Sequence, residues 1–359
     1  MNSAVDAVAL SRILRLADFE PLAREALATE VFDYVAGGSW DEITLAENVA
    51  AWRRRRLRPR VLADVARVTT ATTLLGAPCA LPLAIAPMAA QGELHADGEV
   101  ATARAAAAAG VPFIASTVST RSLEEIAATA PEATRWFQLY TQADVRRTRS
   151  TVERAAAAGY GALVVTVDLP VLGYRERDRR NGYDTAGPWD RAFSLRRDGP
   201  EPIAELEPGT LTWRDLAPIR SWAPDLPLVL KGILHAEDAR LAVEHGADAI
   251  VISNHGARQL DRVPPAVDVL EEVVDAVAGR CEVWVDGGVR RGLDVAIALA
   301  LGARGVLLGR PVLWALAAGG EAGVARALAI VREELEIALA LLGAPAPSAV
   351  TRAHVDPLA

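Results

Sequence analysis

The sequence predicts a (β/α)8 barrel of the TIM type, and three observations support this fold class. Short apolar runs rich in branched side chains alternate with alanine-rich segments of helical periodicity. Eight such repeats occupy roughly 230 residues, close to the ~250 residues typical of this barrel. Most polar residues that could carry chemistry follow the C-terminal ends of the runs, where barrel enzymes build their active sites.

The segment before the first run is expected to be a helical cap, within a single domain spanning residues 1–359. An alanine-rich start and the run Phe32-Asp33-Tyr34 precede a glycine pair there. We assign residues 1–80 to the cap, 81–320 to the barrel, and 321–359 to a C-terminal helix and tail.

The eight apolar runs predict eight parallel strands. Continuous apolar runs are typical of strands that are buried on both faces of a parallel sheet. In chain order the runs are Leu83–Ala86, Phe113–Ala115, Trp136–Leu139, Leu163–Val167, Leu228–Leu230, Ala249–Ile252, Val283–Val285 and Val306–Leu308.

The segments between the runs predict helices, several of which end at a glycine. Three examples are Glu99–Ala109, Ala236–Glu244 and Leu293–Leu301. Glycine readily adopts the left-handed conformation that terminates a helix. The glycines in question are Gly110, Gly159, Gly246 and Gly302. An open doubly wound sheet is the competing fold, but the sequence lacks the Gly-x-Gly-x-x-Gly motif that is typical of the first strand-to-helix turn of such a sheet.

Residues 174–210, after the fourth run, are expected to form a mobile loop. They are polar, contain Pro188 and Pro200, and lack sustained periodicity. Loops of this length often act as lids over an active site.

Composition excludes several classes of function. Lys and Arg number 38 against 46 Asp and Glu, a net charge of −8, which argues against a nucleic-acid partner. Cys79 and Cys281 lie far apart in apolar surroundings, which predicts free thiols and a cytoplasmic location. The N-terminal segment lacks the basic start of a signal peptide, and the alanine-rich stretches are too short to span a bilayer. We therefore expect no membrane association.

The stretch Ser253–Asp261 carries the strongest chemical signal. It follows a predicted buried strand and places His255 three residues before Arg258, with Gly256 between them. A histidine can act as a general base, and an arginine binds a carboxylate through paired hydrogen bonds. A satisfied loop histidine is the competing interpretation, but the nearby arginine favours a site that removes a proton from a carboxylic acid.

Two strand ends predict a phosphate site. Glycines there let backbone N–H groups approach an anion, and the accompanying arginines can clamp its oxygens. Barrels commonly bind phosphate after strands 7 and 8. The residues are Asp286, Gly287, Gly288 and Arg290 after the seventh run, and Gly309 and Arg310 after the eighth.

Other polar residues on the same rim suggest that the phosphate belongs to a flavin. Lys231 could place its charge beside the N1–C2 carbonyl region of the ring and stabilise negative charge there. Gln138 and Thr166 could bond the pyrimidine edge.

Motifs along nearly the whole chain, about residues 31–354, resemble the FMN-dependent 2-hydroxy acid oxidases and dehydrogenases, the group of glycolate, lactate and mandelate oxidases. Besides Ser253–Asp261 they are Phe32-Asp33-Tyr34, Thr44-Leu45-Ala46-Glu47-Asn48, Ile85-Ala86-Pro87, Gln138-Leu139-Tyr140, Thr166-Val167-Asp168, Val229-Leu230-Lys231-Gly232 and Asp286-Gly287-Gly288-Val289-Arg290.

The resemblance implies a role for each matching residue. It implies that His255 is the base and Asp168 its charged partner, and that Arg258 and Arg175 bind the substrate carboxylate. Tyr34 and Tyr140 would donate to the carboxylate and to the reacting oxygen. Flavin contacts are implied for Pro87, Met88, Ala89, Ser116 and Ser253. The implied reaction is oxidation of an (S)-2-hydroxy acid to the 2-oxo acid by a homotetramer.

Physical chemistry supports the pairing of base and carboxylate. A free histidine has a pKa of ~6.5, and a buried carboxylate favours the imidazolium. We therefore expect Asp168 to raise the pKa of His255 and to stabilise the cation after proton transfer.

Two positions depart from the family pattern. Val118 stands where glycolate oxidases carry a tryptophan that walls the side-chain pocket, and Met88 replaces a small polar residue at the flavin. The larger cavity predicts a substrate larger than glycolate, such as a mandelate-type or medium-chain acid. Ala89 and the lack of a haem domain favour oxygen as acceptor, giving H2O2.

Four alternatives stay open at this point. They are a lactate-type oxidase, a dehydrogenase with another electron acceptor, a non-redox FMN barrel enzyme, and a catalytically silent flavin-binding barrel. The residues do not distinguish hydride transfer from a carbanion route.

Overall fold

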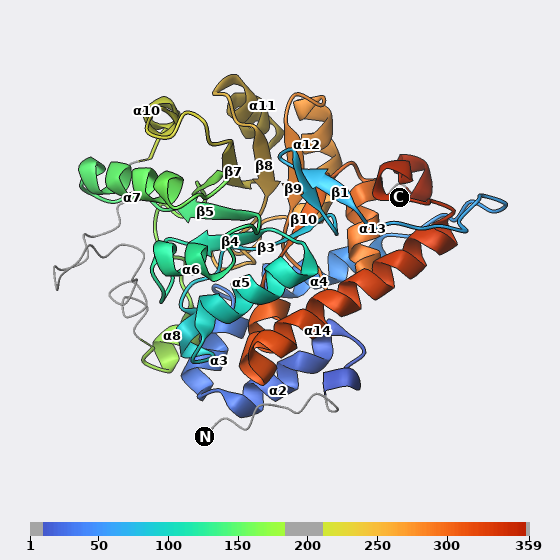
Figure 1. The fold of residues 1–359 in the computed structure, drawn as a ribbon, viewed down its shortest axis with the longest axis horizontal. Helices are drawn as coiled ribbons and strands as arrows, with labels where there is room; N and C mark the ends of the chain where they lie inside the picture. The colour runs from blue at the N-terminus through green and yellow to red at the C-terminus, as the bar shows by residue number, and fades with distance from the viewer. Residues whose placement is uncertain (1–9, 184–210, 357–359) are drawn as a thin grey trace.

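Eight parallel strands close into a barrel in the computed structural model, which describes residues 10–183 and 211–356 (Figure 1). The strands are hydrogen-bonded in the order β10-β3-β4-β5-β6-β7-β8-β9. Each overlaps one predicted run, so the predicted strands and fold class are confirmed. Their bounds are β3 (Leu83–Ile85), β4 (Phe113–Ser116), β5 (Arg135–Leu139), β6 (Leu163–Thr166), β7 (Leu228–Ile233), β8 (Ala249–Ile252), β9 (Glu282–Val285) and β10 (Gly305–Leu308).

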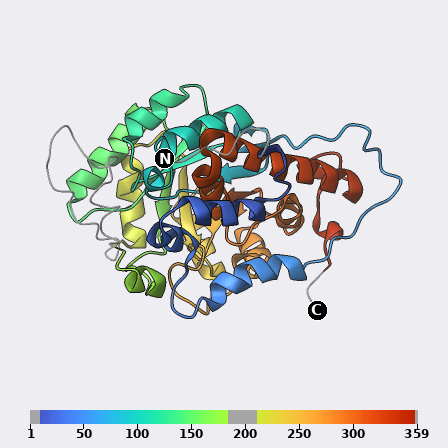
Figure 2. The same ribbon diagram turned by 90° about the horizontal axis from the view of Figure 1, so that it is seen from below.

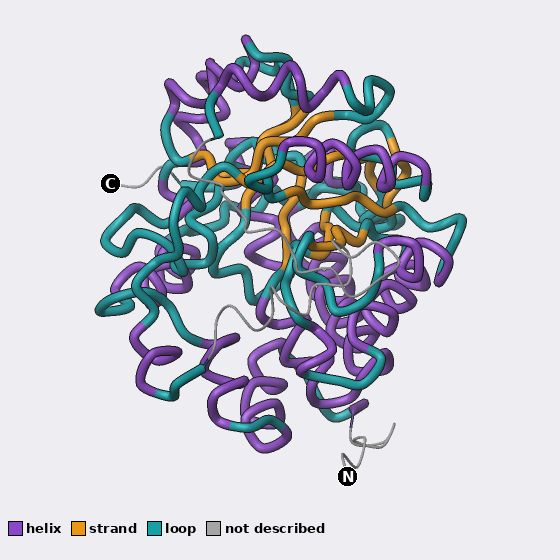
Figure 3. The backbone as a smooth tube through the Cα atoms, turned by 90° about the vertical axis from the view of Figure 1, so that its left-hand side faces the viewer, coloured by secondary structure: helices purple, strands orange, loops and turns teal. Residues whose placement is uncertain are grey.

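Helices surround the strands, as Figure 3 shows. Four glycines predicted at helix ends all have positive φ, namely Gly110 (67°), Gly159 (78°), Gly246 (80°) and Gly302 (102°). The helices from β3 onward are α5 (Gly98–Ala109), α6 (Leu123–Thr129), α7 (Val145–Ala157), α8 (Glu176–Arg180), α10 (Leu216–Ser221), α11 (Ala236–Glu244), α12 (Leu270–Val277), α13 (Gly292–Ala300) and α14 (Arg310–Leu342). The backbone of α14 departs from helical geometry at Gly319 and Gly320.

The N-terminal cap is helical through residue 54. Its helices are α2 (Phe19–Ala26), α3 (Thr29–Ala36) and α4 (Ile43–Arg54) (Figure 2). Helices α2 and α3 contact α14, whereas α4 contacts residues 266–268. Side chains of α4 reach loops after the barrel strands, because Trp52 Nε1 donates to the Gly287 carbonyl at 2.8 Å.

The remainder of the first 80 residues differs from the expected helical cap. It contains an antiparallel hairpin of β1 (Thr72–Leu74) and β2 (Ala77–Cys79). The backbone N–H of Leu75 donates to Glu282 Oε1 at 3.1 Å, at the first residue of β9. The hairpin therefore lies at the N-terminal end of the strands. Its turn residues Leu75 and Gly76 both have positive φ, as a tight hairpin turn requires.

Two tryptophans fill the middle of the barrel. Trp136 on β5 and Trp284 on β9 come from opposite strands, and their rings stack with centroids 5.0 Å apart. Successive side chains of a strand point to opposite faces. Gln138, two residues further along β5, and Asp286, directly after β9, both line the pocket above the tryptophan layer. This layer forms the floor beneath the polar C-terminal end.

Of the expected mobile loop, residues 174–183 contain α8, and residues 184–210 lie outside the described residues. In the described part of the chain, no helix is long and apolar enough to cross a membrane.

Candidate active site

One pocket at the C-terminal ends of the strands gathers nearly all of the predicted site residues. Asp168 and Ser253 do not line it but lie directly behind it, in contact with His255 and Lys231. The predicted residues that do line the pocket are Tyr34, Pro87, Met88, Ala89, Ser116, Val118, Gln138, Tyr140, Thr166, Arg175, Lys231, His255, Arg258, Asp286, Gly287, Gly288, Arg290, Gly309 and Arg310.

The backbone at His255 is held in an unusual conformation. Three consecutive residues, His255 (φ 58°), Gly256 (64°) and Ala257 (61°), lie in the left-handed region. Such strain persists only where the surroundings fix it. The Asn254 side chain accepts from the Ala257 N–H at 3.1 Å, and Ser253 Oγ accepts from the His255 N–H at 3.1 Å. These bonds hold the backbone of the His255 loop in this conformation.

His255 and Asp168 form a buried hydrogen-bonded pair. Nδ1 of His255 lies 2.9 Å from Oδ1 of Asp168. The ionised carboxylate only accepts, so the pairing assigns the proton to Nδ1 and leaves the Nε2 lone pair toward the pocket. The hydroxyl of Tyr140 lies 3.5 Å from this Nε2. The imidazole is therefore oriented to accept a proton from a bound molecule.

The net electrostatic effect on His255 is opposite to the one expected. Burial lowers the pKa of His255 below its ordinary 6.5, and the cations Lys231 and Arg175 add to this, so that Asp168 does not raise it overall. Burial also opposes the charge of Asp168, but His255 and Lys231 outweigh it and lower the pKa of that carboxyl. The prediction of a raised histidine pKa is wrong because it left out desolvation. A lowered pKa keeps His255 neutral near pH 7, ready to accept a proton.

Two arginines lie next to this base. Burial, together with the neighbouring Arg258, lowers the pKa of Arg175 to about 10. Nε of Arg175 donates to the Arg258 carbonyl at 3.3 Å, and the Arg258 guanidinium lies 4.7 Å from the centroid of the Tyr34 ring. Arg175 is buried and Arg258 is half-buried. Two adjacent cations favour an anion between them, and a carboxylate matches the paired donors of a guanidinium.

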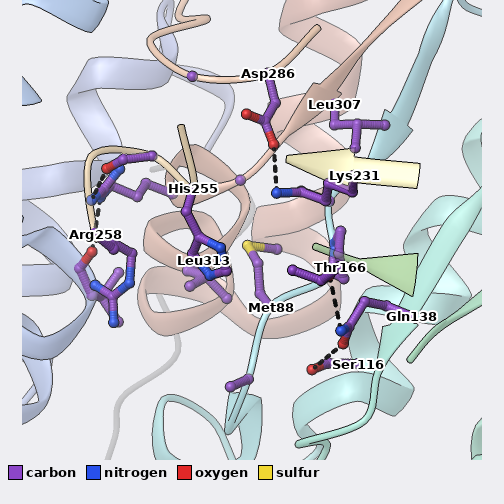
Figure 4. A pocket seen from close by; sticks show the side chains of 18 of the residues that line it. Met88, Ser116, Gln138, Thr166, Lys231, His255, Arg258, Asp286, Leu307 and Leu313 are labelled. Atoms are coloured by element: carbon purple, nitrogen blue, oxygen red, sulfur yellow. Dashed lines mark hydrogen bonds and ion pairs between the residues drawn. The ribbon is translucent and has the colours of Figure 1, made fainter. Parts of the chain in front are cut away.

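The far side of the pocket carries neutral polar groups and a lysine. Gln138 Nε2 donates to Thr166 Oγ1 at 3.0 Å, while its Oε1 accepts from Ser116 Oγ at 3.3 Å. Lys231 Nζ lies 2.8 Å from Ser253 Oγ and 3.2 Å from Asp286 Oδ2. Figure 4 shows this group on the side of the pocket opposite to His255 and Arg258.

The third region of the pocket is a glycine-lined cationic end. Gly287 (φ 87°) and Gly288 (78°) are left-handed, and a Cβ on Gly288 would lie 1.9 Å from the Asn48 carbonyl oxygen. Burial lowers the pKa of Arg290 to about 10 and lowers the pKa of Arg310 strongly. Arg290 and Arg310 line the pocket together with these glycines, and guanidiniums next to glycine backbone N–H groups suit a phosphate. The Arg310 guanidinium also donates to the carbonyls of Gly37 and Gly256, each at 2.8 Å.

Sequence reasoning missed the apolar lining and one supporting residue. Leu169, Leu172 and Leu313 line the pocket but carry no chemical signal in the sequence. Asn48 exchanges two amide hydrogen bonds with Asn254, at 2.9 and 2.8 Å, and so supports the His255 loop. The match of residues 44–48 to the family motif was the available signal for Asn48.

The sequence comparison decides the family. The model of the FMN-dependent dehydrogenase family matches residues 23–357. The chain belongs to this family. As a family member it is an oxidoreductase that uses FMN, and the predicted cofactor and enzyme class are confirmed.

Relatives of known activity cover almost the full chain. An L-lactate oxidase from Nostoc sp. is 50% identical over 93% of this chain and 96% of its own. A 4-hydroxymandelate oxidase from Amycolatopsis orientalis is 47% identical over 94% of this chain and 96% of its own. A mandelate oxidase structure with 3,3-difluoro-2-hydroxy-3-phenylpropionic acid is 46% identical and has a TM-score of 0.88. The match covers 96% of this chain and 98% of the mandelate oxidase chain. The predicted class, FMN-dependent 2-hydroxy acid oxidases, is thus confirmed without fixing the substrate.

The residues present fit FMN. Gly288, Arg290 and Arg310 would hold its phosphate, and Gln138 and Lys231 would hold the polar edge of its ring. Asp286 Oδ1 is buried and has no hydrogen-bond partner among the described residues, so it offers an acceptor to a ligand hydroxyl. When bound, FMN supplies a two-electron acceptor in this pocket.

Proposed function

We propose that this enzyme oxidises a 2-hydroxy acid larger than glycolate to the 2-oxo acid, with oxygen as the electron acceptor and H2O2 as the second product. One observation carries the proposal. His255, which is joined to Asp168 behind it at 2.9 Å, lines the same pocket as the adjacent cations Arg175 and Arg258. A base beside a carboxylate clamp is what a 2-hydroxy acid requires.

Each of these residues has one proposed task. Arg175, Arg258 and Tyr34 bind the substrate carboxylate and so orient the 2-position toward the flavin. Nε2 of His255 accepts the proton that leaves the substrate, and Asp168 stabilises the resulting imidazolium. Burial raises the pKa of Tyr140, so its hydroxyl stays protonated and donates to the reacting oxygen.

The apolar lining supports a larger substrate. Val118 is 1% exposed, and Leu169, Leu172 and Met88 line the same pocket. The family resemblance implies that Val118 takes the place of a tryptophan of glycolate oxidases. An aromatic or extended side chain gains about 0.8 kcal/mol for each further methylene that such a surface buries. The similarity to a 4-hydroxymandelate oxidase supports this size.

A lactate-sized substrate is the second candidate. It is favoured by the 50% identity to an L-lactate oxidase. Anaerobic reduction of the bound FMN by glycolate, lactate, mandelate and 2-hydroxyoctanoate separates the two. We expect mandelate or 2-hydroxyoctanoate to give the highest second-order rate constant, followed by reoxidation in air. A preference for lactate would support the second candidate, and reduction by none of the acids would refute the function itself.

We further propose a cytoplasmic homotetramer. Cys79 and Cys281 are both free thiols, as in a reducing compartment. Ile337 (61% exposed) and Leu341 (71%) lie one turn apart on α14, and this apolar pair would be covered in an assembly. Sedimentation equilibrium of the holoenzyme tests the assembly, and a monomer would refute it.

A further inference from the structure

The central residue of Phe32-Asp33-Tyr34 has no task in the proposed reaction, yet its carboxylate joins two elements of the site. Oδ2 of Asp33 accepts from Asn181 Nδ2 at 2.8 Å, and Oδ1 lies 3.5 Å from Nη1 of Arg177. Arg177 also donates to Glu42. Asp33 belongs to α3 of the cap, whereas Arg177 lies on α8 and Asn181 directly after it.

These two elements each deliver one proposed carboxylate ligand. Tyr34 is the neighbour of Asp33 on α3, and Arg175 is the residue immediately before α8. A second contact joins them, because the ring of Tyr183, just after α8, stacks on the ring of Tyr34 with centroids 4.7 Å apart. The pair of elements therefore brings together two parts of the carboxylate site that lie far apart in the chain.

Arg175 requires such support. Helix α8 has five residues, too few to be stable without tertiary contacts. Arg175 itself is only 8% exposed and lies beside the like charge of Arg258. Repulsion and desolvation both favour movement of Arg175 out of the pocket, and contacts elsewhere on α8 add to its hydrogen bond with the Arg258 carbonyl in opposing that movement.

We propose that Asp33 is a positioning residue that holds α8 against α3 through Arg177 and Asn181, so that Arg175 and Tyr34 meet the substrate carboxylate together. The inference rests on the proposed function, because it uses the carboxylate-binding tasks of Arg175 and Tyr34. Asp33 does not line the pocket. Its effect is therefore on substrate binding and not on the proton-transfer group.

The test compares Asp33→Ala with Asp41→Ala in the FMN-loaded enzyme. Asp41 is a matched control, since it also lies in the cap and pairs with an arginine, Arg262, at 2.7 Å, but both side chains are more than half exposed. We expect Asp33→Ala to raise the KM for the 2-hydroxy acid about tenfold, with kcat within about threefold of the wild type. FMN content should stay at the wild-type level, and Asp41→Ala should change neither constant. Asp33→Asn keeps one acceptor oxygen and should restore part of the loss.

Two results would overturn the inference. The first is a wild-type KM in Asp33→Ala, and the second is an equal fall in kcat and FMN content, which would indicate a general structural role. If Asp33→Ala does not fold, Asn181→Ala removes the shorter bond from the other side, and the same KM criterion applies. Failure of the proposed function is distinguishable, because wild type itself would then not oxidise a 2-hydroxy acid.

Discussion

Replacing Asp168 with Asn removes the buried negative charge beside the proposed base while keeping the shape of the side chain. In the wild type the carboxylate lies 2.9 Å from Nδ1 of His255, and both side chains are less than one-fifth exposed. Proton transfer creates an imidazolium in a site that already contains Lys231 and Arg175. Asp168 is the group that stabilises this new charge.

The hydrogen bond between Asp168 and His255 sets the size of the expected loss in reduction rate. A hydrogen bond to a charged group contributes about 1.5–3 kcal/mol, and about 1.36 kcal/mol corresponds to a tenfold change in rate. Asp168→Asn should therefore slow anaerobic flavin reduction by about 10- to 150-fold, with FMN still bound. The pH dependence has a defined sign. Asp168 raises the pKa of His255 against burial, so its loss lowers that pKa further and moves the acid limb of the rate profile to lower pH.

Stopped-flow reduction by a saturating 2-hydroxy acid, measured across pH, gives both quantities. A reduction rate within twofold of the wild type would refute the assigned task of Asp168. So would an acid limb that moves to higher pH.

Three further predictions follow from the pocket. Val118→Trp should depress kcat/KM for mandelate-sized acids far more than for glycolate, and an equal fall for both would contradict the assignment of the wall. Gly288→Ala should lower Tm and FMN affinity more than Gly76→Ala. Both glycines have positive φ, but only at Gly288 would a Cβ collide, 1.9 Å from the Asn48 carbonyl oxygen. Equal losses of Tm in the two variants would show that the collision is relieved. Mass spectrometry of the cofactor released from denatured holoenzyme should show FMN, and a finding of FAD would contradict the cationic end as a terminal phosphate site.

The strands could be predicted because their signal is local. Continuous apolar runs such as Ala249–Ile252 form strands buried on both faces, and glycine after a helix marks its end. The hairpin at residues 72–79 was missed because each of its strands has only three residues. Its stability comes from distant contacts, such as the bond from Leu75 to Glu282, which no local pattern contains.

The chemical residues of the site were predictable because they are polar and follow buried strands. His255 and Arg258 stand out for this reason, and Lys231 stands out as a cation within the otherwise apolar strand β7. Leu169 and Leu172, in contrast, look like any apolar loop residue. The sign of the His255 pKa shift was not predictable. It depends on how burial and cations outweigh one carboxylate, a balance that exists only once the chain has folded.

The most direct test of the account is the reactivity of His255→Ala. General bases contribute ~10²–10⁴ in rate. His255 accepts the substrate proton in this account and does not hold the cofactor, so the variant should bind FMN as the wild type does. Its flavin should be reduced by the preferred 2-hydroxy acid under anaerobic conditions at least ~10²-fold more slowly. Reduction at a near-normal rate in the FMN-loaded variant would show that another group removes the proton, and would contradict the proposed catalytic pair.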